Sequence, residues 1–503
     1  MFQIMGIGVG EGGGRLAMSM VSTGTNIGAI NTNKGDLAGL PEISESKKLL
    51  LNISAGGSGR DPNFVREAMK TEDVRNSVTA FMKKLLSSTP LFAKCTHCGS
   101  NDQILDKESI GDTHQCSYCH NNFGITALAQ DPNIEHDYIF LFVCLGGGSG
   151  SGLIVDLVEI CLGLSNKKGM AYPVGVVCTL PSDTEDMATK NNAISIFTEL
   201  YNLYAKAGLI APLILVDNQK MFENFNLPLG AMYPTINRAV TGLIHQFNKF
   251  SDQTSTHGAT MDTMNTARLW SLEGCCSMGK FVVGNPASKE AKHNIIVPHP
   301  LDLGEIEDAM KQCTFVDGFD LGSAKGAGII AVAPEYYFAD ENVSTCIKYA
   351  FGKTKEIIGA DGLIFTSQLV DNTKDYLEFY ITYNGLSYPK ERFDRMQDEV
   401  REGRISLRRK QARVDDVPYD TKLEQAQSGQ AFKRLQNITG HEAVEKTNIP
   451  EISFNKKPEP KKQPCNNCYP DPITKKSTGV YRKGGPAPFS GKICPICKGN
   501  GTV

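Results

Sequence analysis

The chain has 503 residues, of which 41% are hydrophobic and 21% charged, with a net charge of -3 at pH 7. This is enough for two or three domains with hydrophobic cores, and no segment holds the 18 or more uninterrupted apolar residues of a membrane span. The first ten residues lack the basic start and the cleavage site of a secretory signal, so we expect a cytosolic protein.

Short apolar strands alternate with helical stretches along the first half of the chain. Apolar, strand-like runs occur at FQIMGIG, NIGAINTN, DYIFLFVC, AYPVGVVCTLP and APLILVD, and most are followed by amphipathic stretches. This alternation predicts an α/β fold with a parallel sheet covered on both faces. A long helix is expected from Tyr233 to Phe250, and a smaller second domain, rich in both helices and strands, is expected to end near residue 390.

Three glycine-rich turns punctuate this first half. GIGVGEGGGRLA satisfies G-x-G-x-x-G at Gly8, Gly10 and Gly13, AGGSGRDP follows at 55–62, and LGGGSGSG follows at 145–152. The flanks of the third turn read as a buried strand and a helix, which favours an anion cradle over a flexible linker. Three turns at the carboxyl ends of strands of one sheet would converge on one polyphosphate.

The first turn by itself is a weak sign of a dinucleotide site. Such a site calls for an Asp or Glu at the end of the second strand, where this chain has Asn31, Thr32 and Asn33 and no acid before Asp36. A G-x-x-x-x-G-K-[ST] loop is also absent from the sequence, which excludes a P-loop. A Rossmann NAD enzyme is therefore disfavoured but stays as an alternative from a different class.

The set of turns, taken together with the segments INTNKGDL, TLPSDTED, LVDNQKM and YPTIN, resembles the tubulin/FtsZ superfamily of GTPases. The first turn and the segment LLLNISAGGSGRDP are similar to the plasmid- and phage-encoded TubZ group. The resemblance covers residues 1 to about 390. It implies a GTP-binding domain over 1–232, a central helix over 233–250 and a C-terminal activation domain over 251–390.

The resemblance also implies which residues bind GTP or GDP. The three turns would surround the phosphates, Glu185 would bind the ribose, Asn218 and Asn237 would read the guanine edge, and Tyr233 would stack on the base; for Tyr233 and Asn237 alone an ordinary amphipathic helix start is the alternative. Mg²⁺ is expected on the phosphates, without a named ligand. The full set of expected nucleotide-binding residues is Gly10, Glu11, Gly12, Gly13, Asn31, Gly56, Gly57, Ser58, Gly59, Gly146, Gly147, Gly148, Ser149, Gly150, Ser151, Gly152, Glu185, Asn218, Tyr233 and Asn237.

In this superfamily the hydrolytic acids come from the neighbouring subunit, in the pattern N-x-D-x-x-D after the long helix. This chain has Asp262 at the first acid, Asn265 at the second and Thr260 at the leading Asn. A carboxylate can polarise water, whereas an amide orients water but cannot accept its proton. We therefore expect slow, assembly-dependent GTP hydrolysis carried mainly by Asp262, and a non-hydrolysing, zinc-dependent DNA-binding scaffold stays as an alternative.

Eight of the 15 cysteines form four C-x-x-C pairs. The first two pairs predict an inserted zinc ribbon over 94–130, with His97, His114 and His120 as alternative ligands, and the last two predict a C-terminal ribbon over 465–503. Two structural Zn²⁺ sites are favoured over free thiols or disulfides, which are rare in the cytosol. The expected metal ligands are Cys95, Cys98, Cys116, Cys119, Cys465, Cys468, Cys494 and Cys497.

The segment between the second domain and the last ribbon, 391–464, is charged and interrupted by prolines, which predicts a mostly extended tail with at most one helix. From Asn455 onward ten Lys or Arg stand against two Asp or Glu. A solvated tail and a contact with DNA, a DNA-bound adaptor or a virion component are both open. The resulting hypothesis is a GTPase that polymerises head to tail and moves or positions DNA or phage particles; an FtsZ- or CetZ-like division or shape protein is the alternative within this fold.

Overall fold

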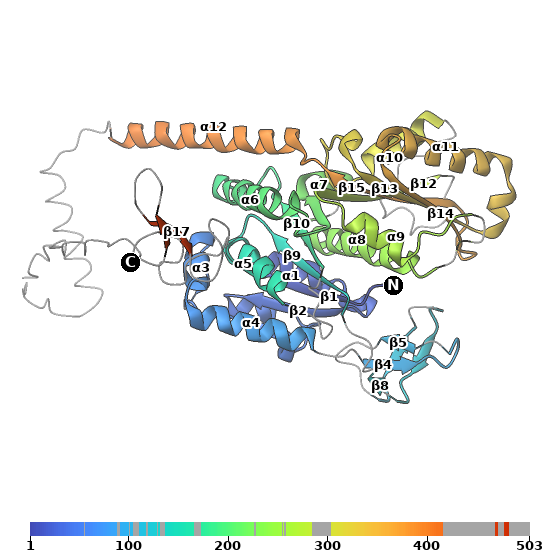
Figure 1. The fold of residues 1–503 in the computed structure, drawn as a ribbon, viewed down its shortest axis with the longest axis horizontal. Helices are drawn as coiled ribbons and strands as arrows, with labels where there is room; N and C mark the ends of the chain where they lie inside the picture. Colours follow the sequence, from blue (N-terminus) through green and yellow to red (C-terminus); the bar gives the residue numbers. More distant parts are fainter. Residues whose placement is uncertain are drawn as a thin grey trace, which may run out of the picture. The chain divides into compact units, whose positions relative to one another are not determined.

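The computed structural model describes residues 1–54, 56–87, 91–99, 101–103, 110–116, 119–127, 129–130, 136–164, 173–225, 228–253, 255, 258–283, 303–415, 468–470 and 477–481. The chain divides into two compact units, Met1–Asp415 and Asp416–Val503. The first unit is built on one large sheet flanked by helices (Figure 1).

The large sheet of the first unit has ten strands. Their spatial order is β14 (Leu363–Val370), β13 (Gly326–Ala333), β15 (Leu377–Leu386), β12 (Cys275–Val283), β11 (Leu213–Asp217), β10 (Val174–Leu180), β9 (Tyr138–Cys144), β1 (Ile4–Val9), β2 (Asn26–Asn31) and β3 (Lys48–Leu50). The seven strands from β3 to β12 pair in parallel. β15 runs antiparallel to both β12 and β13, whereas β13 and β14 are parallel. The expected α/β fold is confirmed.

The order from β3 to β11 contains a topological switch point. The chain builds outward from β1 through β2 to β3, and then returns to the other side of β1 through β9, β10 and β11. Helices that follow neighbouring strands then leave on opposite faces of the sheet, which opens a crevice at the carboxyl ends of β1 and β9. The fold therefore places a ligand site directly after Val9 and Cys144.

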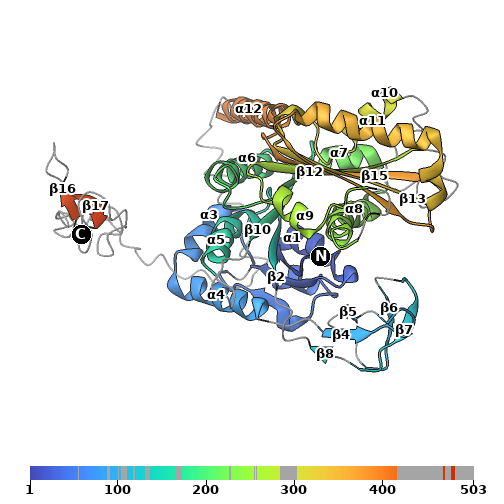
Figure 2. The ribbon, with the colours of Figure 1, turned by 45° about the vertical axis from the view of Figure 1, so that its right-hand side comes forward.

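The helices explain why the central strands read as continuous apolar runs. β9 and β10 are buried along nearly their whole length because helices cover both faces of the sheet. On the β12–β15 half, α8 and α9 lie on one side and α10 and α11 on the other (Figure 2). The helices are α1 (Gly10–Met18), α2 (Lys34–Ala38), α3 (Pro62–Met69), α4 (Glu72–Leu86), α5 (Ser149–Gly163), α6 (Met187–Glu199), α7 (Asn218–Phe225), α8 (Leu229–Phe250), α9 (Thr263–Trp270), α10 (Leu303–Gln312), α11 (Glu341–Ile358) and α12 (Lys390–Asp415). None of them, within the described residues, is long and apolar enough to cross a membrane.

The structure differs from the expected boundaries at two places. The central helix α8 begins at Leu229, one turn before Tyr233. The segment after residue 390 is not extended at its start, because α12 runs from Lys390 to Asp415 and belongs to the first unit. α12 packs against α6, and its Arg392 donates to Asp217 at the end of β11, so the second domain and the tail do not divide near residue 390.

α9 attaches the segment around Asp262 to the amino ends of the central strands. Trp270 is fully buried and its ring lies 5.7 Å from Tyr138, the first residue of β9. The amino group of Met1, just before β1, donates to Thr263 Oγ1 at 3.0 Å. Since β1 spans six residues, or roughly 20 Å, Asp262 lies at the opposite end of the sheet from the switch-point crevice.

The insertion between α4 and β9 forms small sheets of its own. β4 (Leu91–Lys94), β5 (Asn101–Gln103) and β8 (Ala129–Gln130) make one, and β6 (Thr113–Gln115) and β7 (Asn122–Gly124) make another. Its core is a separate small cluster of Ala93, Cys95, Cys116, Phe123 and Ile125. In the second unit, β16 (Cys468–Pro470) pairs antiparallel with β17 (Ser477–Tyr481).

Candidate functional site

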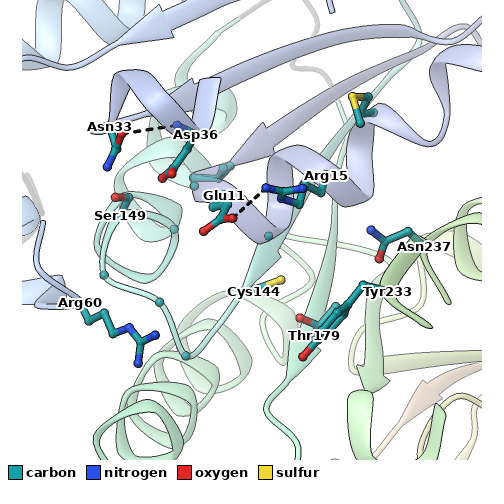
Figure 3. Close-up of a pocket in the computed structure, with 18 of the residues that line it drawn as sticks. Glu11, Arg15, Asn33, Asp36, Arg60, Cys144, Ser149, Thr179, Tyr233 and Asn237 are labelled. Carbon is teal, nitrogen blue, oxygen red and sulfur yellow. Dashed lines mark hydrogen bonds and ion pairs between the residues drawn. The ribbon is translucent and has the colours of Figure 1, made fainter. Parts of the chain in front are cut away.

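A cavity of about 950 Å³ opens at the switch point of the sheet. Its walls come from the carboxyl ends of the parallel strands, the turns that follow them and the first three turns of α8 (Figure 3). This volume lies at the upper end of the range of ligand pockets, which suits a nucleotide. Sixteen of the expected nucleotide-binding residues line it: Gly10, Glu11, Gly12, Gly56, Gly57, Ser58, Gly59, Gly146, Gly147, Gly148, Ser149, Gly150, Glu185, Asn218, Tyr233 and Asn237.

The three glycine turns converge, and their backbones touch. Gly10 has a φ of +73°, and a Cβ on it would lie 2.7 Å from the backbone nitrogen of Gly150. A Cβ on Gly148 would lie 2.4 Å from Ser58 Oγ and 2.7 Å from Arg60 Cα. Only glycine permits both approaches, so the glycines are required by the close packing of the turns as well as by any ligand.

Hydrogen bonds from side-chain hydroxyl and amide groups also hold these turns together. Ser149 Oγ lies 2.6 Å from Thr32 Oγ1 and 3.2 Å from Ser58 Oγ. From α6, Asn192 Nδ2 donates to the carbonyl oxygens of Arg60 and Gly146, both at 3.3 Å. The cradle is therefore cross-linked from three directions, which preorganises its backbone N–H groups.

The cradle attracts anions through its backbone. α1 begins at Gly10 and α5 at Ser149, so the positive ends of two helix dipoles meet at the cavity. Such paired helix N-termini bind phosphate groups without desolvating a long cationic side chain.

The charged side chains of the lining are mixed in sign. The arginines are Arg15, Arg60 and Arg238, and the acids are Glu11, Asp36, Glu42 and Glu185. Arg15 pairs with Glu11 at 3.0 Å. Burial, followed by the negative charge of Glu11, raises the pKa of Asp36. Two neighbouring carboxylates beside a phosphate cradle are the donor set that a divalent cation prefers.

Glu185, Asn218 and α8 form the end of the cavity where the sequence predicts the nucleoside. Glu185 Oε1 accepts a hydrogen bond of 3.1 Å from Ser182 N, which fixes the loop after β10. Tyr233 is 43% exposed and packs edge-on against Phe222, with ring centroids 5.2 Å apart. Burial, followed by the charges of Glu185 and Cys144, raises the pKa of Tyr233. The phenol ring is thus neutral and is partly exposed at the cavity.

Four of the expected nucleotide-binding residues do not line the cavity. Asn31 is fully buried, and its Nδ2 donates to Asp36 Oδ2 at 3.0 Å, so it shapes the turn after β2 from behind. Gly13 is needed for the approach of α1 to β9, since its Cβ would lie 2.1 Å from Phe142 O. Ser151 Oγ donates to Leu145 O, and Gly152 packs against α3, where its Cβ would lie 2.6 Å from Pro62 O. These four residues support the cradle.

Asp262 and Asn265 do not lie on the cavity of their own chain. Asp262 is exposed and caps α9, where its Oδ1 accepts from Asn265 N at 2.8 Å. Asn265 Nδ2 donates to Thr260 O at 3.2 Å. Asn265 thus supports the loop, and Asp262 keeps an exposed carboxylate at the end of the sheet opposite the cavity.

Sequence reasoning missed several lining side chains. Arg15 lies one helical turn after Glu11, and Arg60 directly follows Gly59 within the second glycine turn, so spacing alone could have indicated both. Arg60 also has a left-handed φ of +63°, which is uncommon for a side-chain-bearing residue. Cys144 lines the cavity at the end of β9, and burial raises the pKa of its thiol to about 11.

The inserted module holds four thiols in one cluster. The Sγ atoms of Cys95, Cys98, Cys116 and Cys119 all lie within 4.8 Å of one another. Cys95 Sγ is 3.7 Å from Cys119 Sγ, and Cys98 Sγ is 3.6 Å from Cys116 Sγ. This clustering is compatible with a closed tetrahedral zinc site. Of the second set, Cys468 begins β16, whereas Cys465, Cys494 and Cys497 lie outside the described residues.

Comparisons with known proteins agree with this architecture. No protein-family model matches the chain. Curated TubZ proteins of Bacillus cereus and Bacillus anthracis are each 23% identical over 301 residues, which is 55% of this chain and 63% of theirs. The match thus spans less than two thirds of these relatives.

Solved structures match a larger share of the chain. A GTPγS-form protofilament of Bacillus thuringiensis serovar israelensis TubZ has a TM-score of 0.59 at 17% identity, covering 82% of this chain and 94% of that one. A GTPγS-bound protofilament of CetZ2 from Haloferax volcanii has a TM-score of 0.55 at 18% identity, covering 80% and 99%. At these identities the likeness concerns the fold.

Proposed function

Because the chain has the fold of the tubulin/FtsZ superfamily, we propose that it binds GTP and polymerises head to tail into cytoskeletal filaments. The observation that carries this proposal is the arrangement of the two ends of the sheet. A phosphate-type cavity opens at the carboxyl ends of β1 and β9, and the Asp262 carboxylate is exposed at their amino ends. Stacking of chains along this axis brings Asp262 of one subunit to the cavity of the next.

GTP fits the cavity in three parts. The glycine turns receive the phosphates, Glu185 receives the ribose, and Tyr233 stacks on the base while Asn218 and Asn237 read its edge. A triphosphate carries more negative charge than the mixed lining neutralises, and Mg²⁺ supplies the missing positive charge. Glu11 and Asp36 are the residues that would hold this ion, directly or through water.

Hydrolysis in the filament is the finer part of the proposal. Asp262 of the adjoining subunit polarises the attacking water, and the backbone donors of the cradle stabilise the negative charge that develops on the phosphates. Arg60 adds a guanidinium at the phosphate end of the cavity, where its present partner is the exposed Asp186 at 3.1 Å. A single carboxylate supports slow turnover, since Asn265 cannot accept a proton.

The inserted cysteine module and the basic end of the chain have separate proposed roles, which follow from their side chains. The four clustered thiols of the inserted module hold structural Zn²⁺. The basic end of the chain, from Asn455 onward, engages an acidic partner, either DNA or a DNA-bound adaptor, so that the filament moves or positions DNA.

Sedimentation of the full chain with GTP, GDP or GTPγS, together with phosphate release, tests the function. We expect pelleting with GTP and GTPγS, weaker pelleting with GDP, and phosphate release only above the critical concentration for assembly. A chain that binds NAD in preference to GTP, or that stays monomeric with every nucleotide, would contradict the proposal.

A further inference from the structure

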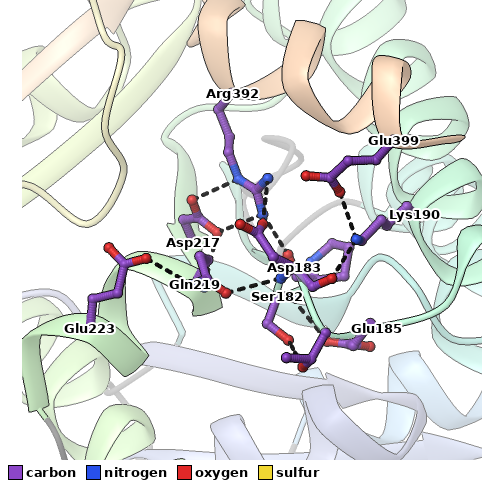
Figure 4. A network of polar contacts seen from close by, with 11 residues as sticks. Ser182, Asp183, Glu185, Lys190, Asp217, Gln219, Glu223, Arg392 and Glu399 are labelled. Atoms are coloured by element: carbon purple, nitrogen blue, oxygen red, sulfur yellow. Dashed lines mark hydrogen bonds and ion pairs between the residues drawn. The ribbon is translucent and has the colours of Figure 1, made fainter. Parts of the chain in front are cut away.

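The first turn of α12 inserts an arginine beneath the loops of the nucleoside end. Arg392 is 3% exposed, and its Nε donates to Asp217 Oδ2 at 2.7 Å while Nη2 donates to Asp217 Oδ1 at 3.2 Å (Figure 4). This is the two-pronged geometry in which a guanidinium and a carboxylate bind most specifically. Asp217 is 1% exposed and ends β11, directly before Asn218 of the cavity.

The same guanidinium also holds the loop after β10. Arg392 Nη2 donates to Pro181 O at 2.7 Å, and Nη1 pairs with Asp183 Oδ1 at 3.1 Å. This loop carries Glu185, which lines the cavity, whereas Arg392 itself does not. One side chain of the last helix thus bridges the two loops that present the expected ribose and base ligands.

Further contacts dock the next three turns of α12 on the same region. Glu399 pairs with Lys190 at 2.6 Å, and Lys190 Nζ in turn donates to Asp183 O at 2.7 Å. Arg404 Nη2 donates to Asn191 Oδ1 at 2.8 Å. Residues 392, 399 and 403 share one helical face, and a Cβ on Gly403 would meet Met187 Sδ at 3.1 Å. The docked face of α12 therefore runs along the start of α6 and the loop that precedes it.

We expect this buried ion pair to determine the position of the two loops more than it adds net stability. The desolvation of both charges offsets much of their attraction, yet removal of one partner leaves the other uncompensated. The loops at 181–186 and 217–218 consequently have one well-defined arrangement when α12 is docked, and lose a shared anchor when it is not.

We infer that Arg392 is a positioning residue for the nucleoside end of the cavity, and that docking of α12 and binding of the guanine nucleotide favour each other. The inference rests on the proposed function, since it assigns Glu185 and Asn218 to the nucleoside. Coupling between two sites is reciprocal. If docking of α12 strengthens nucleotide binding by a given free energy, nucleotide binding strengthens the docking of α12 by the same amount. The helix that precedes the C-terminal unit would therefore be docked more firmly when the nucleotide is bound than when it is absent.

The test compares the affinity of the full chain for GTP with its affinity for inorganic triphosphate, by calorimetric titration in Mg²⁺. In Arg392→Lys and Arg392→Gln we expect GTP affinity to fall at least tenfold and triphosphate affinity to stay within twofold, because the phosphate turns follow other strands. Lys390→Gln is the matched control, since Lys390 pairs at 3.4 Å with exposed Asp394 on the same helix. A purely structural role would change the melting temperature without separating the two ligands.

A folded Arg392→Lys chain with unchanged GTP affinity, or with equal losses for both ligands, overturns the inference. If the Arg392 variants do not fold, Glu399→Gln replaces them, with an expected loss of about threefold for GTP alone. Hydrogen exchange supplies an independent measurement: GTP should slow exchange in 390–404, and Arg392→Lys should accelerate it in 181–186. A wild-type chain that binds no GTP refutes the proposed function, and exchange in 181–186 then still decides whether Arg392 holds these loops.

Discussion

The cysteine cluster and the cavity are two sites built in opposite ways. The cluster gathers four side chains from within 25 residues, Cys95 to Cys119, around a small core of its own. The cavity gathers its lining from Val9 to Arg238, mainly through backbone turns, and still lacks the carboxylate proposed for hydrolysis. A site made of local side chains is complete in one short segment, whereas a site made of strand ends needs the whole sheet and, we propose, a second subunit.

The largest effect is expected from removing one thiol of the cysteine cluster. Cys98→Ser removes one thiolate of four, and because structural zinc contributes about 10 kcal/mol to the folding of such modules, we expect the bound zinc to be lost and the insertion to unfold. Elemental analysis should show one zinc fewer per chain. GTP binding should persist, since the two sites share no core.

The control for this prediction is Cys346→Ser, which alters a half-buried thiol of α11 outside the cluster. It should leave the zinc content unchanged. An unchanged zinc content in Cys98→Ser would show that the cluster holds no metal.

The next effect tests whether the extended site is completed in trans. Asp262→Ala should assemble with GTP but hydrolyse it about 100- to 1,000-fold more slowly, the usual loss when a preorganised polar group is removed. Mixing it with a variant that cannot bind GTP should restore part of the activity, because the intact cavity of one chain then meets the intact Asp262 of the other. Phosphate release from the mixture measures this, and absence of any recovery would contradict the arrangement in trans.

A smaller effect is expected from a substitution that pushes two glycine turns of the cavity apart and so weakens GTP binding. Gly148→Ala places a Cβ 2.7 Å from Arg60 Cα, and we expect the second and third turns to move apart at a cost of about 2 kcal/mol, or roughly 30-fold in GTP affinity. Gly163→Ala, at the end of α5, is the control because its Cβ would meet nothing within 4 Å. Equal affinities in the two variants would mean that the close approach is not needed for binding.

The smallest expected effect is a loss of stability of the first unit at low pH, which originates at His245 and not at the cysteine cluster. Burial, followed by the nearby charge of Lys249, lowers the pKa of His245 on α8 from its usual 6.5 to about 4. The unfolded chain therefore binds the proton more readily, so stability is full above pH 6.5 and falls as pH is lowered toward 4. We expect a loss of roughly 1–2 kcal/mol, after allowance for partial exposure of the ring.

Urea unfolding of the first unit at several pH values measures this loss, with zinc release followed in parallel because protons also displace zinc from thiolates. His245→Gln should flatten the dependence in this range. The same slope in both proteins would assign the effect to other groups.

Features built from one short segment were predictable from the sequence, whereas contacts between distant segments were not. The cysteine spacing indicated the cluster directly, and the glycine turns were recognised because each is a continuous motif between a strand and a helix. Arg392 was out of reach because it follows Asp217 by 175 residues in a segment whose charge and low aromatic content predict an extended tail. The start of α8 was placed late because the sequence directed attention to the Tyr233–Asn237 pair and not to Pro228, the residue directly before the helix.

The sequence by itself determined the strands, the glycine turns and the thiol cluster of the insertion, because hydrophobic periodicity and short motifs act over a few residues. Only the tertiary structure decided that the three turns touch, that Asn31 and Gly13 support the cradle from behind, and that α12 is anchored beneath the loops that follow β10 and β11. These facts depend on the order of strands in the sheet and on buried pairing between distant charges, and no local pattern records which distant residue will compensate a buried one.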